Sequence, residues 1–263
     1  MDKLLYVAMS GAKETLRAQA ANSHNLANAN TTGFKARRTQ FQDLLYQSFL
    51  QPGSAAGAQT TIPSGLQLGL GTRPSANSIV FTQGNFQETD NPLDLVIQGK
   101  GFFQIKQPDG TLAYTRDGSF ALDKNGNVVD ASGNPLEPAI AVPAQATSVT
   151  IASDGTVSYT QQGTTAAQVL GQIQLANFPN PGGMNSIGAG LFLPTDASGA
   201  PVVANPGSTE GVGTLQQGYI EDSNVSVVEE FINMISSQRA FEANTKVVKA
   251  ADDMLSQVNG LTR

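Results

Sequence analysis

The chain has 263 residues, of which 40% are hydrophobic and only 6% aromatic, and it contains no tryptophan and no cysteine. The lack of cysteine excludes disulfides, cysteine nucleophiles and thiolate metal sites. The net charge of −6 is unevenly spread, because the first 40 residues carry six basic groups against two acidic ones. Nucleic-acid binding would need a larger basic face with aromatic or groove-reading partners, so it is not expected.

No apolar run approaches the ~20 residues of a membrane-spanning helix. The apolar run Leu4–Met9 is also shorter than the apolar core of a secretory signal, about 7–15 residues, and charged residues follow it closely. If the protein leaves the cytoplasm, we expect a route that cleaves no N-terminal peptide.

The first predicted element is an amphipathic helix over residues 3–29. Its apolar residues recur at alternating spacings of three and four, which is typical of a helix that packs against other helices. Asn28 and Gly33 favour an end to this helix, because Asn and Gly tolerate the left-handed conformation. The apolar stripe consists of Leu5, Met9, Ala12, Leu16 and Leu26, with Gln19 and Ser23 in the remaining places.

Residues 35–80 are predicted to form an extended connector. The segment 37–50 contains Phe41 and Leu44 in a short apolar stretch that is compatible with a helix at its start. The following residues are rich in Gly, Ala, Gln, Thr, Ser and Pro, as in extended connectors. A Gly-Leu-Gly-Thr run at 69–72 lacks the Gly-Lys-Ser/Thr ending of a phosphate loop and a helix after it, so phosphate binding is not expected.

Residues 81–222 are predicted to form a mainly antiparallel β domain. From about residue 80 the hydrophobic pattern has a period of two, and Asp-Gly and Asn-Gly pairs supply the positive φ angles of tight hairpins. We expect strands at 93–97, 102–105, 111–116, 120–122, 128–129, 149–151 and 156–159. We also expect a further pair formed by 169–175 and 190–193.

The last predicted element is a helix over about 226–258. Ser226 and Glu229 have the spacing of a capping box, which satisfies amides at a helix start and contributes about 1 kcal/mol. Asn259-Gly260 is expected to end the helix. Its stripe consists of Val227, Phe231, Met234, Phe241, Val248 and Leu255, and polar Gln238, Thr245 and Asp252 fill the remaining places.

The candidate catalytic groups are few. The one histidine, His24, lies inside the first helix and is interpreted as a surface residue, because a catalytic base or metal ligand needs partners around it. The carboxylates Glu88, Asp90 and Asp94 lie close in sequence, but nothing around them indicates a tuned acid–base pair. We therefore expect no enzyme activity and no cofactor.

One turn resembles the start of a calcium-binding loop. Asp123, Asn125 and Asn127 have the right spacing, but position 12 of such a loop falls on Asn134 instead of a bidentate glutamate. A hairpin turn is the favoured interpretation, and no metal site is predicted.

Both ends and the middle of the chain carry recognisable motifs. Residues 25–35 read Asn-Leu-Ala-Asn-Ala-Asn-Thr-Thr-Gly-Phe-Lys, and residues 223–225 read Ser-Asn-Val and open the last helix. Gly-Lys-Gly-Phe-Phe at 99–103 and Tyr-Thr-Arg-Asp-Gly-Ser-Phe at 114–120 lie between them. Together these motifs resemble the signatures of the bacterial flagellar basal-body rod family. Residues 41–47 and 61–69 resemble its distal rod members, whereas residues 1–12 look more like a proximal rod paralogue.

Pattern and resemblance together indicate an α+β fold with discontinuous terminal helices that form a coiled-coil-like pair. Residues 1–34 and 223–263 would form the helical domain, 35–80 the extended connector and 81–222 a β-rich outer domain. The residues expected to make assembly contacts are Leu5, Met9, Leu16, Asn25, Leu26, Asn28, Gly33, Phe34, Phe41, Leu44, Ser226, Glu229, Phe231, Met234, Phe241, Val248 and Leu255.

The resemblance implies a structural subunit that polymerises into a hollow, torque-transmitting drive shaft between motor and hook. It implies contacts with copies of itself, with adjacent rod and hook axial proteins, and with the surrounding peptidoglycan-layer and outer-membrane bushing rings. It also implies passage through the flagellar type III export apparatus to a periplasm-spanning rod. Alternatives are a proximal rod or hook-type subunit, a secreted β-rich adhesin or cell-wall-binding module, and a wall hydrolase that rests only on scattered carboxylates.

Overall fold

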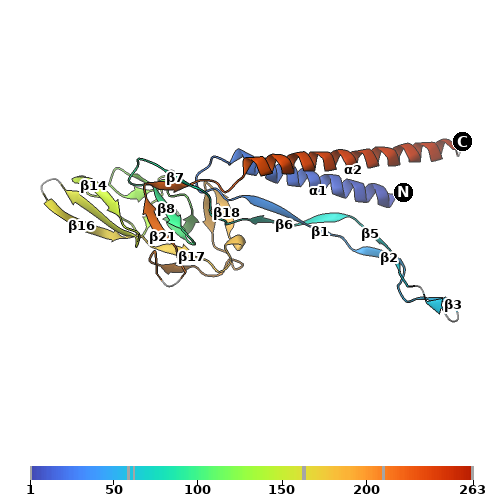
Figure 1. Ribbon diagram of the computed structural model, residues 1–263, viewed down its shortest axis with the longest axis horizontal. Coiled ribbons are helices and arrows are strands. Elements are labelled where there is room, and N and C mark those ends of the chain that lie inside the picture. Colours follow the sequence, from blue (N-terminus) through green and yellow to red (C-terminus); the bar gives the residue numbers. More distant parts are fainter. Residues whose placement is uncertain (1, 58–59, 62, 162–163, 209–210, 262–263) are drawn as a thin grey trace. The chain divides into compact units, whose positions relative to one another are not determined.

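The computed structural model describes residues 2–57, 60–61, 63–161, 164–208 and 211–261 (Figure 1). The chain divides into two compact units, each of which draws on separate stretches of the sequence. The helical unit consists of Met1–Ala27, Arg37–Ser78 and Ser226–Arg263. The β unit consists of Asn28–Ala36 and Ile79–Val225. The backbone therefore alternates between the two units.

The helical unit contains one long helix from each end of the chain. Helix α1 spans Asp2–Ala27 and α2 spans Val227–Leu261, and the two pack against each other. At the start of α2, the amide of Glu229 donates to Ser226 Oγ at 3.5 Å and the amide of Glu230 donates to the Ser226 carbonyl at 3.0 Å. Both predicted terminal helices are confirmed, although α2 continues through Asn259-Gly260 instead of ending there.

The connector in the helical unit is a ladder of paired strands. The bounds are β1 Arg37–Asp43, β2 Tyr46–Leu50, β3 Ala55–Gly57, β4 Thr60–Thr61, β5 Leu66–Gly69 and β6 Thr72–Ile79. Strand β1 pairs with β6, β2 with β5 and β3 with β4, so the segment folds back on itself (Figure 1). The predicted helical start within 37–50 is therefore wrong. The apolar spacing there was compatible with either structure, and the returning strand supplies the hydrogen-bond partners that decide it.

The β unit is built on a seven-stranded sheet with the order β18-β19-β10-β9-β17-β20, and β13 pairs with β9. All of its pairings are antiparallel. The strand bounds are β9 Phe102–Lys106, β10 Leu112–Thr115, β13 Leu136–Glu137, β17 Leu175–Asn177, β18 Asn185–Gly188, β19 Leu191–Leu193 and β20 Val202–Ala204. A short 3-10 helix, η1, spans Pro181–Gly183.

Smaller antiparallel sheets complete the β unit. Strand β8 (Leu95–Gln98) pairs with β21 (Thr214–Gln217), and β7 (Phe86–Glu88) pairs with β22 (Tyr219–Glu221). The hairpin of β11 (Ala121–Leu122) and β12 (Val128–Val129) confirms the turn predicted around Asn125-Gly126. The fourth small sheet consists of β14 Ala146–Ile151, β15 Thr156–Gln161 and β16 Thr164–Gln172.

The predicted pairing of 169–175 with 190–193 is wrong. Strand β16 pairs with β15, and β19 pairs with β10 and β18. Alternation in a sequence indicates that a segment is a strand, but it does not identify the partner, which the shared core decides.

Two apolar clusters lie on the two faces of the large sheet, because adjacent strand residues point in opposite directions. Phe103 and Ile105 belong to the larger cluster and are fully buried. Phe102 belongs to the smaller one, where its ring meets Phe178 edge-on at 5.9 Å. The Phe102-Phe103 pair of the sequence therefore contributes to both cores at once.

Candidate assembly interface

The side of α2 that faces α1 follows a regular pattern. Apart from Thr245, its less exposed side chains recur at alternating spacings of four and three. These seam positions are Glu230, Met234, Ser237, Phe241, Asn244, Val248, Ala251 and Leu255. Large apolar residues thus alternate with small or polar ones.

Four of the six residues of the predicted α2 stripe lie on the seam, namely Met234, Phe241, Val248 and Leu255. Val227 and Phe231 instead point largely to solvent and are 42% and 49% exposed. The sequence pattern placed the gaps one residue too late, because small residues at the true seam carry no hydrophobic signal.

The most buried positions of α1 carry small and polar residues. Ala8, Glu14 and Asn25 are the most buried residues of α1. At Gly11 an added Cβ would lie 3.0 Å from Asn244 Nδ2, which places this glycine against the α2 seam. Close helix packing requires such residues, since large side chains would hold the two backbones apart.

Two residues of the predicted apolar stripe of α1 point largely to solvent. Met9 and Leu16 are 56% and 49% exposed, whereas Leu5 and Leu26 are half-buried. Periodicity alone located an apolar face correctly but could not assign its partner. The face built from large residues remains available to another surface.

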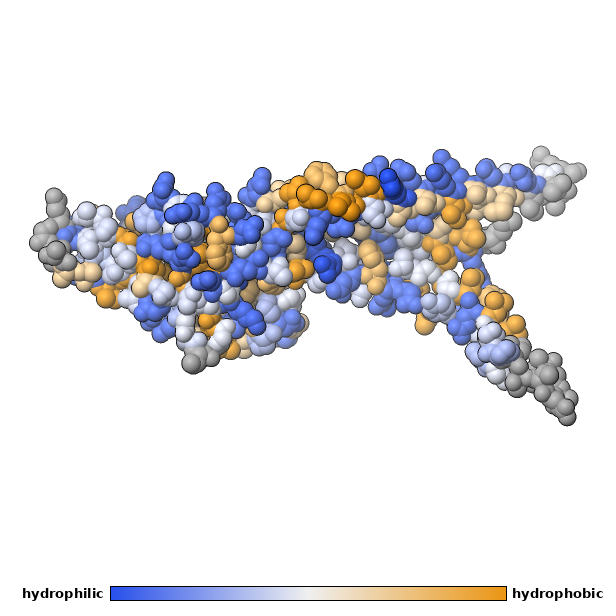
Figure 2. Space-filling view, viewed as in Figure 1, coloured by the Kyte–Doolittle hydropathy of each residue, from blue (hydrophilic) through white to orange (hydrophobic). Residues whose placement is uncertain are grey.

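A second exposed apolar surface covers the first turns of α2, and Figure 2 shows it as a patch over that part of the helix. Val228, Ile232 and Ile235 are 69%, 61% and 51% exposed, and Phe231 lies beside them. We call these four residues the α2 patch. Contiguous exposed apolar surface of this kind marks an interaction site more often than isolated exposed residues do.

Asn25 joins three elements of the helical unit. Its Nδ2 donates to the Arg37 carbonyl and to Glu230 Oε1, both at 2.9 Å. Its Oδ1 accepts from the Arg37 amide at 2.8 Å. This side chain, which is almost fully buried, ties the end of α1 to the start of β1 and to the first turn of α2.

The strand ladder lies against α1 near its N-terminus. The Lys3 ammonium lies 5.3 Å from the centre of the Phe49 ring and donates to the Gln47 side chain. The amide of Thr72 donates to Ser10 Oγ at 3.4 Å. Of the predicted contact residues on the ladder, Phe41 is 43% exposed and Leu44 is half-buried.

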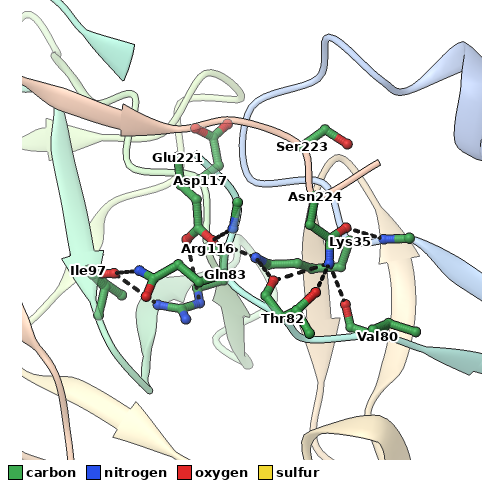
Figure 3. A network of polar contacts seen from close by, with 12 residues as sticks. Lys35, Val80, Thr82, Gln83, Ile97, Arg116, Asp117, Glu221, Ser223 and Asn224 are labelled. Carbon is green, nitrogen blue, oxygen red and sulfur yellow. Dashed lines mark hydrogen bonds and ion pairs between the residues drawn. The ribbon is translucent and has the colours of Figure 1, made fainter. Parts of the chain in front are cut away.

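A buried ionic cluster in the β unit joins distant parts of the chain (Figure 3). Lys35 Nζ lies 2.6 Å from Glu221 Oε1 and donates to the Thr82 carbonyl at 2.8 Å. The same carboxylate oxygen accepts from the Gly84 amide at 2.9 Å. Arg116 Nε lies 3.8 Å from Glu221 Oε2. All three charged side chains are at least nine-tenths buried.

Asn224 extends this cluster to the neighbouring backbone. Its Oδ1 accepts from the Ala36 amide at 2.7 Å, and its Nδ2 donates to the carbonyls of Val80 and Thr82 (Figure 3). We call Lys35, Arg116, Glu221 and Asn224 the clasp. It holds together three passes of the chain, at residues 33–36, 80–84 and 221–224.

Burial determines the electrostatics of the clasp. Desolvation lowers the pKa of the Lys35 ammonium from its usual value, and the adjacent Glu221 carboxylate opposes that effect. Desolvation likewise lowers the pKa of the Arg116 guanidinium. Such a pair remains charged only because each partner compensates the other, so removing one partner leaves an expensive buried charge.

Gly33 approaches this region closely. It has a φ of +68°, and its amide donates to the Glu221 carbonyl at 2.7 Å. A Cβ there would lie 2.6 Å from the Asp117 amide nitrogen. The predicted left-handed glycine is therefore confirmed, and close packing adds a second reason for it. Asn28 lies one turn earlier, where its carbonyl accepts from the Thr31 amide, and Phe34 is half-buried.

The structure shows where the residues considered for catalysis or metal binding lie. His24 lies on the exposed side of α1, and Asp123 accepts hydrogen bonds from the amides of Asn125 and Asn127 at 2.8 Å in its hairpin turn. Asp94 is buried and accepts from Thr89 and Asn91. The described residues contain no cluster of three or more metal-ligating side chains. None of the helices described is long and apolar enough to span a membrane.

The family comparisons match three parts of the chain. Residues 5–35 match the family described as flagella basal body rod protein, and residues 96–159 match the flagellar hook protein FlgE/F/G D1 domain. Residues 216–261 match the C-terminal part of flagellar basal body rod FlgEFG proteins.

Similar proteins match over nearly the full length. The flagellar basal-body rod protein FlgG of Buchnera aphidicola subsp. Acyrthosiphon pisum is 48% identical over 253 residues, covering 95% of this chain and 97% of the relative. The chain belongs to the flagellar basal-body rod protein family. FlgG proteins of Borreliella burgdorferi and Caulobacter vibrioides are 42% and 44% identical and cover 100% and 97% of this rod-family chain, and 100% and 98% of their own length.

Sequence reasoning missed several residues that organise this rod-family fold. Glu221, Arg116, Glu230 and Asn244 are buried or half-buried polar residues. Glu221 had a detectable signal, since it ends an otherwise apolar-aromatic strand and lies two residues before the Ser-Asn-Val motif. Its partner Lys35 closes the N-terminal motif, and Asn224 of the Ser-Asn-Val motif bonds the next residue, Ala36, so the two motifs meet in the clasp.

Proposed function

We propose that this chain is a structural subunit of the flagellar distal rod, and that it polymerises into a hollow, torque-transmitting shaft between motor and hook. Full-length similarity to proteins named as basal-body rod proteins supports this role. The observation that carries it further is the outward position of the large apolar residues of both terminal helices, including Met9, Leu16 and the α2 patch. The resemblance of residues 41–47 and 61–69 to distal rod members supports the position in the shaft.

The terminal helices form the inner, polymerising part of the subunit in this proposal. The four–three seam of α2 and the small-residue face of α1 support a coiled-coil-like pair within one subunit. The opposite faces, with Leu5, Met9 and Leu16 on α1 and the α2 patch on the other helix, would contact neighbouring copies. Each helix would then have one face for its own chain and another for the polymer.

In this proposal, the two helices fold and pair only when neighbouring subunits are present. Ordering a residue costs roughly 1–2 kcal/mol of conformational entropy, and the α2 seam contains only four large apolar side chains. A lone pair leaves Met9, Leu16 and the α2 patch exposed to water. We therefore infer that the helices are largely unfolded in the isolated subunit and fold when they join the rod.

The remaining parts would make outer contacts. The strand ladder exposes Leu45, Tyr46 and Leu66, and an isolated two-stranded hairpin is marginally stable in water. Packing of this ladder across neighbours would stiffen the shaft. The β unit would form the outer domain, facing adjacent axial proteins and the bushing rings after export through the type III apparatus.

Polymerisation of the purified full chain tests the proposal. Ile232→Asp combined with Ile235→Asp places two charges in the α2 patch without touching the seam, so sedimentable polymers should be lost. Gln238→Asp is a matched control, because it adds a charge at an exposed polar position of the same helix. Normal polymers from the double variant, seen by electron microscopy, would contradict the assignment of this patch.

A further inference from the structure

The clasp lies within the β unit and includes no residue of the two long helices. Its hydrogen bonds and ion pairs involve residues 33–36, 80–84, 116 and 221–224, all within the β unit. The Gly33 amide adds a bond to the Glu221 carbonyl, and the Val80 amide adds one to the Ala36 carbonyl, at 2.7 and 2.8 Å. These contacts can persist when the helices are unfolded.

The N-terminal pass depends on the clasp for its attachment to the β unit. The short segment Asn28–Ala36 contributes no strand to the sheets of the β unit. Its described anchors include Lys35 on Glu221 and Thr82, and Ala36 on Asn224 and Val80. The C-terminal pass, by contrast, follows β22, which the sheet pairing with β7 already holds.

The two attached passes lead directly into the two helices. The N-terminal pass runs from residue 28 to residue 36 and begins directly after α1, which ends at Ala27. The C-terminal pass ends at Val225, two residues before α2 begins. When two chain segments are tethered close together, each has a high effective concentration with respect to the other. Formation of the helix pair then starts from neighbouring attachment points instead of from the ends of a long flexible chain.

We propose that the clasp is a preassembly device: in the isolated subunit, before the helices fold, it holds together the chain segments that follow α1 and precede α2. This inference rests on the proposed function, because it gives the clasp a role in rod assembly. The clasp acts by positioning: it shortens the search by which α1 and α2 find each other when a subunit joins the polymer.

The buried charges explain why the device would be specific. Lys35, Arg116 and Glu221 leave two cations around one carboxylate, and Glu221 Oε2 and Arg116 Nε make no hydrogen bond to the described residues. A misplaced N-terminal pass would leave this arrangement with an uncompensated charge. Buried ionic groups of this kind select one register over others.

The test compares hydrogen exchange and polymerisation of the full chain. The variant Lys35→Met removes the ion pair with Glu221 and keeps the side-chain volume, while Arg116 remains beside the Glu221 carboxylate, so no buried charge is left uncompensated. In the wild-type isolated subunit, the amides of Gly33, Ala36 and Val80 should be protected even where the helix amides exchange freely. In the variant, these three amides should exchange about tenfold faster or more, since loss of a charged hydrogen bond shifts a local opening equilibrium by about that factor.

The nucleation of polymers should slow by a similar factor in the variant, while the amides of Phe103, Ile105 and Leu175 in the sheet core keep their protection. Lys100→Met is the matched control, because it makes the same chemical change at an exposed position of the β unit. The proposal is overturned if Gly33, Ala36 and Val80 are unprotected in the wild-type subunit, or if the variant loses their protection yet nucleates at the wild-type rate. Failure of the wild-type chain to polymerise would instead count against the proposed function, and the exchange measurement would still decide whether the clasp is closed.

Discussion

At the residue scale, Gly33 shows how a short family motif can be read in physical terms. Its φ of +68° favours glycine, and the Asp117 backbone leaves no room for a Cβ. The sequence predicted the first constraint from the type of residue. It could not predict the second, because the approach of residue 117 depends on the tertiary fold.

Substitution of Gly33 separates these two constraints. Gly33→Ala should lower the free energy of unfolding of the β unit by more than about 1 kcal/mol, because it adds both backbone strain and a steric clash. Gly110→Ala is the control, since Gly110 lies in the same unit and also has a positive φ, +85°, but has nothing within 4 Å of an added Cβ. Urea unfolding followed by tyrosine fluorescence measures both. Equal losses in the two variants would argue that the contact with Asp117 has no energetic effect.

The Asp123 turn predicts a dependence on pH. Hydrogen bonds from Asn127 and Asn125 lower the pKa of the Asp123 carboxyl, so the folded state favours its charged form. A carboxyl with a depressed folded pKa stabilises the fold above the unfolded pKa of about 3.9 and loses that contribution as pH falls through the folded pKa. Asp123→Asn should therefore be less stable than wild type at neutral pH, and the difference should shrink in acid.

The comparison requires urea unfolding at about pH 7 and at about pH 3, below the unfolded value. Lys124→Gln removes a charge from the same turn but leaves the Asp123 hydrogen bonds in place, so its effect should not follow this pattern. A stability gap for Asp123→Asn that stays constant with pH would contradict the role of the charged carboxylate.

At the element scale, the sequence predicted the existence of both helices but only part of their packing. Met234 and Phe241 were placed on the α2 seam correctly, whereas Phe231 was not. On α1 the large residues Met9 and Leu16 gave the strongest pattern, yet Ala8 is buried instead and Gly11 lies against α2. Hydrophobic periodicity reports where apolar residues gather, and close helix packing uses residues that carry little such signal.

The strand ladder marks a second limit of prediction from sequence. Residues 37–50 have a short apolar pattern that fits a helix or a strand, and only the returning segment β5–β6 resolves it. The individual strands of the β domain were mostly predicted, since turn residues mark their ends. Their order in the sheet was not, because partners such as β9 and β17 are far apart in sequence.

Helix content is the measurable consequence of assembly-coupled folding. Helices α1 and α2 contain 26 and 35 of the 263 residues. Far-UV circular dichroism of the isolated subunit should show much less helix than these elements provide, and the signal should rise on polymerisation. Two stable long helices in the soluble subunit would contradict the proposal. The Ile232→Asp/Ile235→Asp variant serves as a control, since without polymers its helix signal should stay low.

At the scale of the whole molecule, the ladder should affect the polymer more than the subunit. Deletion of residues 52–72 removes the outer part of the ladder but no residue of the β unit. Polymers should become softer or bend, while the β unit keeps its unfolding midpoint. Persistence length from electron micrographs measures the first effect and urea unfolding the second. Unchanged stiffness would argue against the ladder as a stiffening element.

The route of the backbone has a consequence for engineering. The Gly84 amide donates to the Glu221 carboxylate at 2.9 Å, so the chain leaves and re-enters the same place in the fold. The sequence between these two residues is therefore an insert whose ends lie side by side. Foreign domains with equally close termini are the natural replacements for it. Exchange at this junction would decorate a filament at every subunit while leaving the helix sequences untouched.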